Sequence, residues 1–315
     1  MKKYVVDKLA QYVIVLAIVS VIIFVMVRLN PTDPVSVIVG GKQTTAETVA
    51  NIRAEFNLDK TYFEQYLIWI KGIFQGDFGT SFQYRQNVTS LIMKRLPVTV
   101  GLVLLSSVIA LVLSVPLGII TALKQNTPLD TGLSVIQLIL VACPPFLTSI
   151  LMILLITIFT PGVSFTGSFT NFNEYMQRIL YPSIALAFSM IALTSRVTKT
   201  SMIEQLNSNY TLVAKSKGLS MRQRVLNHCL KNSLIPVITI FGTQMGVLIV
   251  GTVLVENVFS LAGLGSILID GVKSCDYPIV QGIVMLLVFV FITISMLLDM
   301  LYAVIDPRIR AKSGK

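Results

Sequence analysis

Six uncharged stretches long enough to cross a lipid bilayer constrain this sequence more than any other feature. They run approximately over residues 9–27, 98–123, 131–159, 179–195, 234–255 and 277–298. A bilayer core about 30 Å thick needs roughly 20 apolar residues per helix. Because 54% of the chain is hydrophobic and only 13% is charged, a soluble core of this length could not bury its apolar surface. The sequence therefore predicts an all-α membrane protein with six transmembrane helices and excludes a water-soluble fold.

The first stretch resembles a signal peptide only in its basic start. It is too long, and no small-residue cleavage site follows it. We predict a retained helix that ends at Arg28, before the helix-breaking Pro31-Thr32-Asp33-Pro34. The predicted division is a first transmembrane helix over 1–29, an external loop over 30–95, and a five-helix core over 96–315 with an inner loop at about 196–233.

The distribution of charge predicts the orientation of these helices. With the N-terminus inside, the cytoplasmic segments carry fifteen Lys or Arg against four acidic residues, whereas the external segments carry ten of each. The positive-inside rule then places both termini in the cytoplasm. The basic residues are divided among short loops rather than gathered in one stripe with aromatic side chains, which excludes nucleic-acid binding.

The sequence lacks the residues that several kinds of chemistry require. One histidine and three cysteines exclude a zinc site built from His and Cys, and they suggest no disulfide framework. No phosphate-binding Gly-x-x-x-x-Gly-Lys-Ser/Thr occurs, since Gly40-Gly41-Lys42 is followed by Gln43. No His-Glu-x-x-His occurs and no Gly-x-Ser-x-Gly lies in a span, which argues against an intramembrane enzyme.

The external loop contains a predicted amphipathic helix. Tyr62, Tyr66, Ile70 and Ile73 recur at helical steps, with Trp69 among them, and turn-forming residues follow over 76–81. An interfacial helix of this kind often places a tryptophan at the level of the lipid headgroups. It either packs on the transmembrane bundle or takes part in docking an external partner.

The inner loop predicts two helices joined at a glycine. The first runs from about Tyr210 to Lys217, and Gly218 supplies a left-handed residue at its end. The second begins with Ser220 and Gln223 in capping-box spacing and continues toward Pro236. Small Ala214 and Gly218 at the corner would let a partner surface approach closely.

Three features within or beside the spans have alternative explanations. Gly242 and Gly246, with Gln244 between them, indicate either close helix packing or a face that lines a path. The Cys143-Pro144-Pro145 segment must bend the third span, either as a kink that shapes a cavity or as a packing irregularity. Asp299 near the end of the last span is a functional candidate or a structural ion-pair residue. His228 is interpreted as a capping or packing residue.

Ala214-Lys215-Ser216-Lys217-Gly218 resembles the Ala-x-x-x-Gly centre of the loop by which permease subunits of ATP-binding cassette (ABC) importers seat on their ATPases. Leu212 and Val213 stand where that pattern has Glu and Ala. The peptide and nickel branch is more similar, through Lys217-Gly218-Leu219-Ser220, His228 and Lys231-Asn232. Further landmarks of that branch are Gln65-Tyr66, Gly76-Asp77-Phe78-Gly79-Thr80-Ser81-Phe82, Leu96-Pro97, Pro116-Leu117-Gly118, Val255-Glu256-Asn257-Val258-Phe259, Gly263-Leu264-Gly265, Asp276-Tyr277-Pro278-Ile279-Val280-Gln281 and Asp306-Pro307-Arg308-Ile309-Arg310.

The resemblance implies a type I ABC importer permease of the bacterial or archaeal cytoplasmic membrane, which is not itself an enzyme and has no cofactor of its own. Its implied partners are a second permease, two ATPases that bind ATP-Mg, an external substrate-binding protein and membrane lipid. The implied ATPase-coupling residues are Tyr210, Ala214, Lys217, Gly218, Leu219 and Ser220, and the translocation-path candidates are Gln244, Gly246 and Pro144. Peptides are the expected substrate, with nickel or a nickel chelate as the alternative. A stand-alone secondary transporter or channel is the alternative from another class, and it would need intramembrane acids, of which only Asp299 is available.

Overall fold

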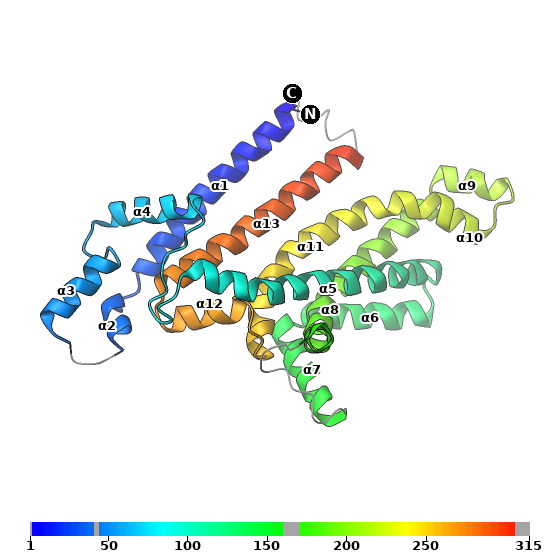
Figure 1. Ribbon diagram of the computed structural model, residues 1–315. Helices are drawn as coiled ribbons and strands as arrows, with labels where there is room; N and C mark the ends of the chain where they lie inside the picture. Colours follow the sequence, from blue (N-terminus) through cyan, green and yellow to red (C-terminus); the bar gives the residue numbers. More distant parts are fainter. Residues whose placement is uncertain (1, 41–43, 160–170, 306–315) are drawn as a thin grey trace. The chain divides into compact units, whose positions relative to one another are not determined.

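The computed structural model describes residues 2–40, 44–159 and 171–305 (Figure 1). The Asp306–Arg310 landmark lies outside the described residues. Regular structure within the described ranges is helical, apart from an isolated bridge between Thr80 and Asn87. The helices are α1 (Lys2–Arg28), α2 (Pro34–Val39), α3 (Ala46–Glu55), α4 (Tyr62–Phe74), α5 (Val88–Leu123), α6 (Pro128–Ala142), α7 (Pro145–Phe159), α8 (Phe172–Leu206), α9 (Asn209–Ser216), α10 (Met221–Arg224), a π-helical turn (Val225–Cys229), α11 (Leu230–Val258), α12 (Leu264–Lys273) and α13 (Tyr277–Ile305).

The membrane-spanning segments agree with the predicted stretches, with one difference. Five helices of the described chain are long and apolar enough to cross a membrane, and the bent pair α6–α7 makes a sixth if it counts as one span. The axes of α6 and α7 differ by 109°. Cys143 between them is extended, with ψ 118°, and Pro144 has no N–H to continue a helix. The predicted bend is therefore a complete break.

The chain folds into two compact units, neither of which is continuous in sequence. Unit 1 comprises residues 1–99 and 262–293, and unit 2 comprises residues 100–261 and 294–315. The predicted division into 1–29, 30–95 and 96–315 follows membrane topology rather than packing, and as a topological division it stays a prediction.

In unit 1, two of the sequence landmarks form one structure. The hydroxyl of Ser81 donates to Asp276 Oδ2 at 2.6 Å, and the backbone N–H of Gln83 donates to the same oxygen at 2.9 Å. Ser81 and Asp276 are both fully buried. A core beneath them joins the start of α5 to α12 and α13, and its buried members are Val88, Leu91, Ile92, Leu264, Ile267, Ile279 and Ile283.

Helix α4 is the amphipathic helix predicted in the loop, and it packs on α1. Tyr66 and Trp69 lie against the ring of Phe24, with ring centroids 5.2 and 6.0 Å away. Its first turn is closed by a capping box, in which the hydroxyl and the backbone N–H of Thr61 donate to Glu64 and hold the pKa of that carboxyl below its usual value. The structure thus favours packing on the bundle for this face of α4.

In unit 2, α8 is the central helix, contacted by α6, α7 and α11. Close approaches occur at glycines: a side chain at Gly118 of α5 would meet Thr198 Cβ at 2.4 Å, and one at Gly242 of α11 would meet Leu298 at 2.4 Å. Hydropathy predicted only residues 179–195 of α8, because Arg196 and Lys199 follow. The helix nevertheless extends from Phe172 to Leu206, and Lys199 forms an ion pair with Asp130 of α6 at 2.5 Å.

Candidate functional site

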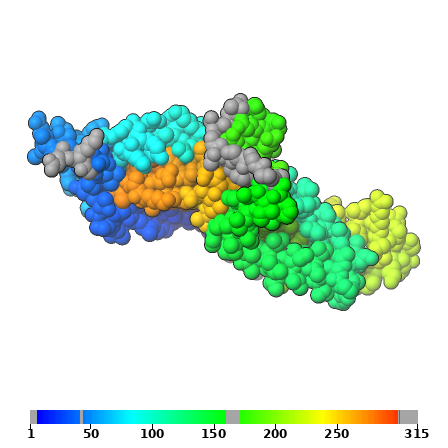
Figure 2. Space-filling view, turned by 90° about the horizontal axis from the view of Figure 1, so that it is seen from below, coloured from blue at the N-terminus to red at the C-terminus, as the bar shows by residue number. Residues whose placement is uncertain are grey.

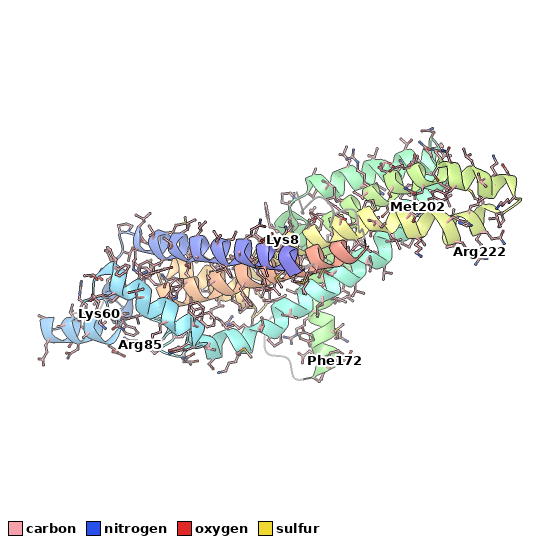
Figure 3. All side chains as sticks on the ribbon, turned by 90° about the horizontal axis from the view of Figure 1, so that it is seen from above. Lys8, Lys60, Arg85, Phe172, Met202 and Arg222 are labelled. Atoms are coloured by element: carbon pink, nitrogen blue, oxygen red, sulfur yellow. The ribbon has the colours of Figure 1, made fainter. Side chains whose placement is uncertain are left out.

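The predicted helix–glycine–helix segment is present at one end of unit 2, beyond the connection between α5 and α6 (Figure 1). We call residues 207–224 the elbow. In the space-filling view its yellow-green atoms form the outer end of that unit (Figure 2). Met202 and Arg222 are labelled at this end in Figure 3. About half of what hydropathy marks as a long inner loop thus belongs to extensions of the helices on either side, and the elbow connects them.

Gly218 ends α9 in the conformation that the sequence predicted. Its φ is +80°, a left-handed value that glycine adopts without a Cβ penalty. The N–H of Gly218 donates to the carbonyl of Lys215 at 3.0 Å, and the N–H of Leu219 donates to that of Ala214 at 3.2 Å. These two bonds define a Schellman motif, which satisfies the last carbonyls of the helix and reverses the chain.

The second helix begins at once, as predicted. Ser220 accepts a hydrogen bond from the Gln223 backbone, while the Gln223 side chain accepts one from the Ser220 N–H at 2.9 Å. The helix then widens into the π turn that contains half-buried His228 and runs on as α11. Pro236 lies inside α11 and does not end it. A π turn adds one residue to a helical turn and is frequent at functional sites.

Two side chains of α9 fasten the elbow to the long helices. The hydroxyl of Tyr210 donates to Gln205 Oε1 of α8 at 2.6 Å and accepts from Asn232 Nδ2 of α11 at 3.1 Å. Thr211 is fully buried, and its hydroxyl donates to the Gln205 carbonyl at 2.8 Å and contacts Cys229 Sγ at 3.5 Å. Hydrogen bonds thus join α9 to both α8 and α11.

A small apolar core lies beneath the elbow. Ala122 at the end of α5, Met202 of α8, and Val225 and Cys229 of the π turn are all buried and pack together. Ala214 is also buried, with 6% of its surface exposed. Ala214 therefore packs inside the chain, although its small side chain at the corner predicted the close approach of a partner.

The outer surface of the elbow is apolar with basic residues between. Leu212 is 51% exposed, Val213 54% and Met221 44%. Lys215, Lys217, Gly218, Ser220 and Arg222 are exposed beside them, and Leu219 is half-buried. A Cβ built on Gly218 meets no atom of the chain within 4 Å. Leu212 and Val213 are not among the predicted coupling residues, although apolar residues at two consecutive positions of a polar helix are a visible signal.

The path candidates lie elsewhere in unit 2. Gly246 is buried on α11 and Gln244 is half-buried, while Pro144 is exposed at the α6–α7 break. A Cβ at Gly251 of α11 would come within 3.8 Å of Pro145, so α11 passes close to that break. The role of Gly246, Gln244 and Pro144 in a translocation path stays a prediction. The side chain of Asp299 lies outside the described residues. Among the described residues no three His, Cys, Asp or Glu side chains cluster as metal ligands.

Comparison with known proteins identifies the family. Residues 114–311 match the model of the binding-protein-dependent transport system inner membrane component, and residues 1–103 match the N-terminal model of the same transport systems. The chain belongs to this family. It is therefore a multi-pass inner-membrane permease subunit and not an enzyme. Membership implies a substrate-binding protein and partner subunits that hydrolyse ATP.

Relatives within the family match along almost the whole chain. The oligopeptide transport system permease protein AppB of Bacillus subtilis is 30% identical over 98% of this chain and 99% of its own. The dipeptide transport system permease protein DppB of Escherichia coli is 31% identical over 93% and 94%. A chain of the MetNI methionine ABC transporter in an inward-facing crystal structure aligns with TM-score 0.58 and 15% identity, over 69% of this chain and 96% of that one. This last likeness confirms the ABC permease fold.

Proposed function

We propose that this chain, together with a second permease subunit, forms the pathway of an ABC importer for peptides. Two ATP-binding subunits hydrolyse ATP-Mg, and an external substrate-binding protein delivers the peptide. The full-length similarity to two peptide permeases supports this assignment and favours peptides over nickel or a nickel chelate. Dependence on a binding protein, which defines the family, excludes a stand-alone secondary transporter or channel.

In this proposal both termini and the elbow lie in the cytoplasm, and α2, α3 and α4 lie outside. The charge distribution supports the orientation, since the segments placed inside carry fifteen basic residues against four acidic ones. The exposed apolar residues of α1, such as Val21, Ile22 and Val25, face membrane lipid.

The elbow is the surface on which an ATPase subunit seats, and its geometry is the observation that carries the proposal. Exposed Leu212, Val213 and Met221 supply apolar contact area, and Gly218 leaves open space for the partner. Because Tyr210 and Thr211 fix α9 to α8 and α11, movement of the ATPase reaches two spanning helices without an intervening flexible loop.

The translocation path runs along α11 beside the α6–α7 break. Gly246 and Gln244 lie on α11, and Pro144 marks the break, where carbonyls without helical partners can face a polar path. The chain thus contributes alternating access, while the ATPases contribute the chemistry.

The Gly218→Val substitution tests the elbow. Valine at φ +80° costs on the order of 1–3 kcal/mol of backbone strain, and its methyls enter the space left for the partner. The substitution lies outside the packed core, so we expect normal expression and membrane insertion. In the complete importer reconstituted in vesicles, peptide uptake and substrate-stimulated ATPase activity should fall together.

Two matched substitutions separate strain from bulk. Gly218→Asn tolerates the left-handed backbone but keeps a side chain in the gap, and Lys217→Ala removes one exposed charge without altering the turn. We expect a marked loss for Asn and a small one for Ala. Normal uptake by Gly218→Val with the ATPase still bound would mean that the ATPase seats on another surface.

A further inference from the structure

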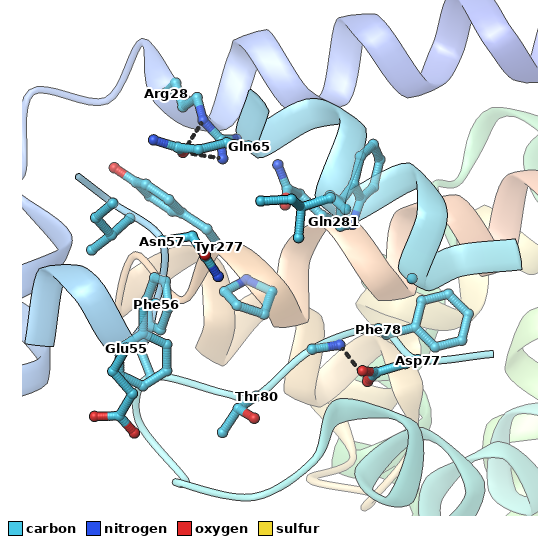
Figure 4. A pocket seen from close by; sticks show the side chains of 17 residues that line it. Arg28, Glu55, Phe56, Asn57, Gln65, Asp77, Phe78, Thr80, Tyr277 and Gln281 are labelled. Atoms are coloured by element: carbon cyan, nitrogen blue, oxygen red, sulfur yellow. Dashed lines mark hydrogen bonds between the residues drawn. The ribbon is translucent and has the colours of Figure 1, made fainter. Parts of the chain in front are cut away.

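A cavity in unit 1 has polar side chains in its walls that the transport pathway does not explain. Its volume is about 300 Å³. The end of α1, the segment before α4, α4 itself, residues 77–80 and the start of α13 line it (Figure 4). These segments are far apart in sequence but belong to one compact unit.

Two hydrogen-bond donors in the cavity wall have no acceptor among the described residues. Gln281 is only 3% exposed, and both its Nε2 and the indole Nε1 of Trp69 are buried without a partner. Buried donors are nearly always paired in native proteins, because an unpaired one loses its hydrogen bond to water. Two unpaired donors on one cavity therefore favour an acceptor-rich ligand.

Arg28 adds a positive charge to the same wall. Its guanidinium donates to Gln65 Oε1 at 2.8 Å and to the Phe24 carbonyl at 3.2 Å, and it stacks 3.3 Å from the Phe24 ring centroid. Among the described residues no carboxylate forms a salt bridge with Arg28, and Asp33 pairs with Arg53 instead. The charge of Arg28 is thus held by neutral groups and remains available to an anion.

The opposite wall is acidic. Figure 4 shows Arg28, Gln65 and Gln281 along one side of the cavity, and Glu55, Thr80 and Asp77 along the other. Glu55 and Asp77 are both exposed. The Asp77 Oδ1 atom accepts from the Gly79 N–H at 2.9 Å, which fixes that carboxylate in place. The cavity therefore has a donor-rich wall and an acidic wall.

We propose that this cavity binds a short zwitterionic peptide of two or three residues. The C-terminal carboxylate accepts hydrogen bonds from Gln281 and Trp69 and pairs with Arg28, while the ammonium group lies toward Glu55 and Asp77. The volume is at the lower end of the range for ligand pockets, which limits the length of the peptide. The choice of peptides over other zwitterions rests on the proposed function, and the site itself is distinct from the path candidates on α11.

Trp69 provides a direct measurement, because it is the only tryptophan in the chain. The purified full-length chain in phosphatidylcholine nanodiscs is titrated with dialanine while indole fluorescence is recorded. Pairing of the indole N–H should shift the emission in a saturable manner. N-acetyl-dialanine and dialanine amide each lack one terminal charge, and each should bind at least about tenfold more weakly.

Substitutions in the cavity wall test which residues produce the fluorescence response to dialanine. Gln281→Leu preserves volume and removes the donor, and Arg28→Gln removes the charge; each should weaken dialanine binding about tenfold or more. Gln75→Leu makes the same substitution as Gln281→Leu at a position outside the cavity, and it should bind dialanine as the unmodified chain does. Unchanged affinity in both cavity variants would overturn the proposed contacts.

The ligand class is tested by competing probes. Absence of any saturable response to dialanine up to millimolar concentration overturns the proposal. Equal binding of the two blocked peptides, an equal response to inorganic phosphate, or loss of the dialanine response in phosphatidylethanolamine nanodiscs also overturns it, in favour of a simple anion or a lipid headgroup. The titration needs no ATPase or binding protein, so its failure is distinguishable from failure of the elbow to couple transport.

Discussion

Asn232 and Tyr210 are joined by a hydrogen bond of 3.1 Å, from the Asn232 amide to the phenolic oxygen. The same oxygen donates to Gln205, so a single hydroxyl group connects α8, α9 and α11. Hydrogen bonds of this kind contribute about 0.5–1.5 kcal/mol each. Such energies orient a surface helix without being essential to the fold.

Tyr210→Phe removes this hydroxyl and keeps the ring. We expect thermal stability to change by about 1 kcal/mol or less, since these groups are exposed. Peptide uptake by the reconstituted importer should fall about three- to tenfold, with ATPase activity less dependent on substrate. Tyr84→Phe in unit 1 is the control. An unchanged uptake rate would show that the hydroxyl does not transmit movement.

The orientation of the chain is tested by cysteine labelling. Single cysteines replace Lys60, between α3 and α4, or Arg222, in the elbow, in a background without Cys143, Cys229 and Cys275. An impermeant maleimide added to intact cells should label position 60 and not position 222. Labelling of position 222 from outside would invert the proposed topology.

The Lys199–Asp130 pair anchors α6 to α8. The two side chains are 21% and 7% exposed, and removing one partner of a fully buried pair costs about 3–5 kcal/mol. We expect Lys199→Met to lower the free energy of unfolding by about 2–3 kcal/mol, because the pair is slightly exposed. The double variant Asp130→Asn with Lys199→Met should recover part of this loss. Additive effects in a thermal unfolding assay would mean that the pair does not couple the helices.

Two glycines provide a matched test of helix packing. A Cβ at Gly118 would lie 2.4 Å from Thr198 Cβ, whereas one at Gly132 meets nothing within 4 Å. Gly118→Ala should therefore separate α5 from α8 and lower stability by about 1–3 kcal/mol. Gly132→Ala should raise stability by up to about 1 kcal/mol through helix propensity. Similar effects at both positions, measured by thermal unfolding in detergent, would contradict the close approach.

Local features of the elbow could be predicted because their causes are local. A glycine followed by Ser-x-x-Gln specifies a left-handed residue and a capping box within a few positions, and both are present at Gly218 and Ser220. The helix break at Pro144 was visible for the same reason. The continuation of α11 through Pro236 could not be predicted in this way, because a proline inside a helix normally kinks or ends it.

Contacts between distant segments were beyond sequence reasoning. Arg28 and Gln281 meet at one cavity, yet no periodicity or spacing relates residues that far apart. The inward packing of Ala214 depends on tertiary structure around α9, and the ion pair of Lys199 joins α8 to a residue of α6. Hydropathy registers neither.

The buried bond between Ser81 and Asp276 bears on how the protein is made. Ser81 leaves the ribosome long before Asp276, and unit 1 needs residues from both ends of the chain. During synthesis the first 99 residues must therefore wait, inserted but incompletely packed, until α12 and the start of α13 arrive. Premature termination in between would leave Val88, Leu91 and Ile92 without the partners on α12 and α13 that cover them.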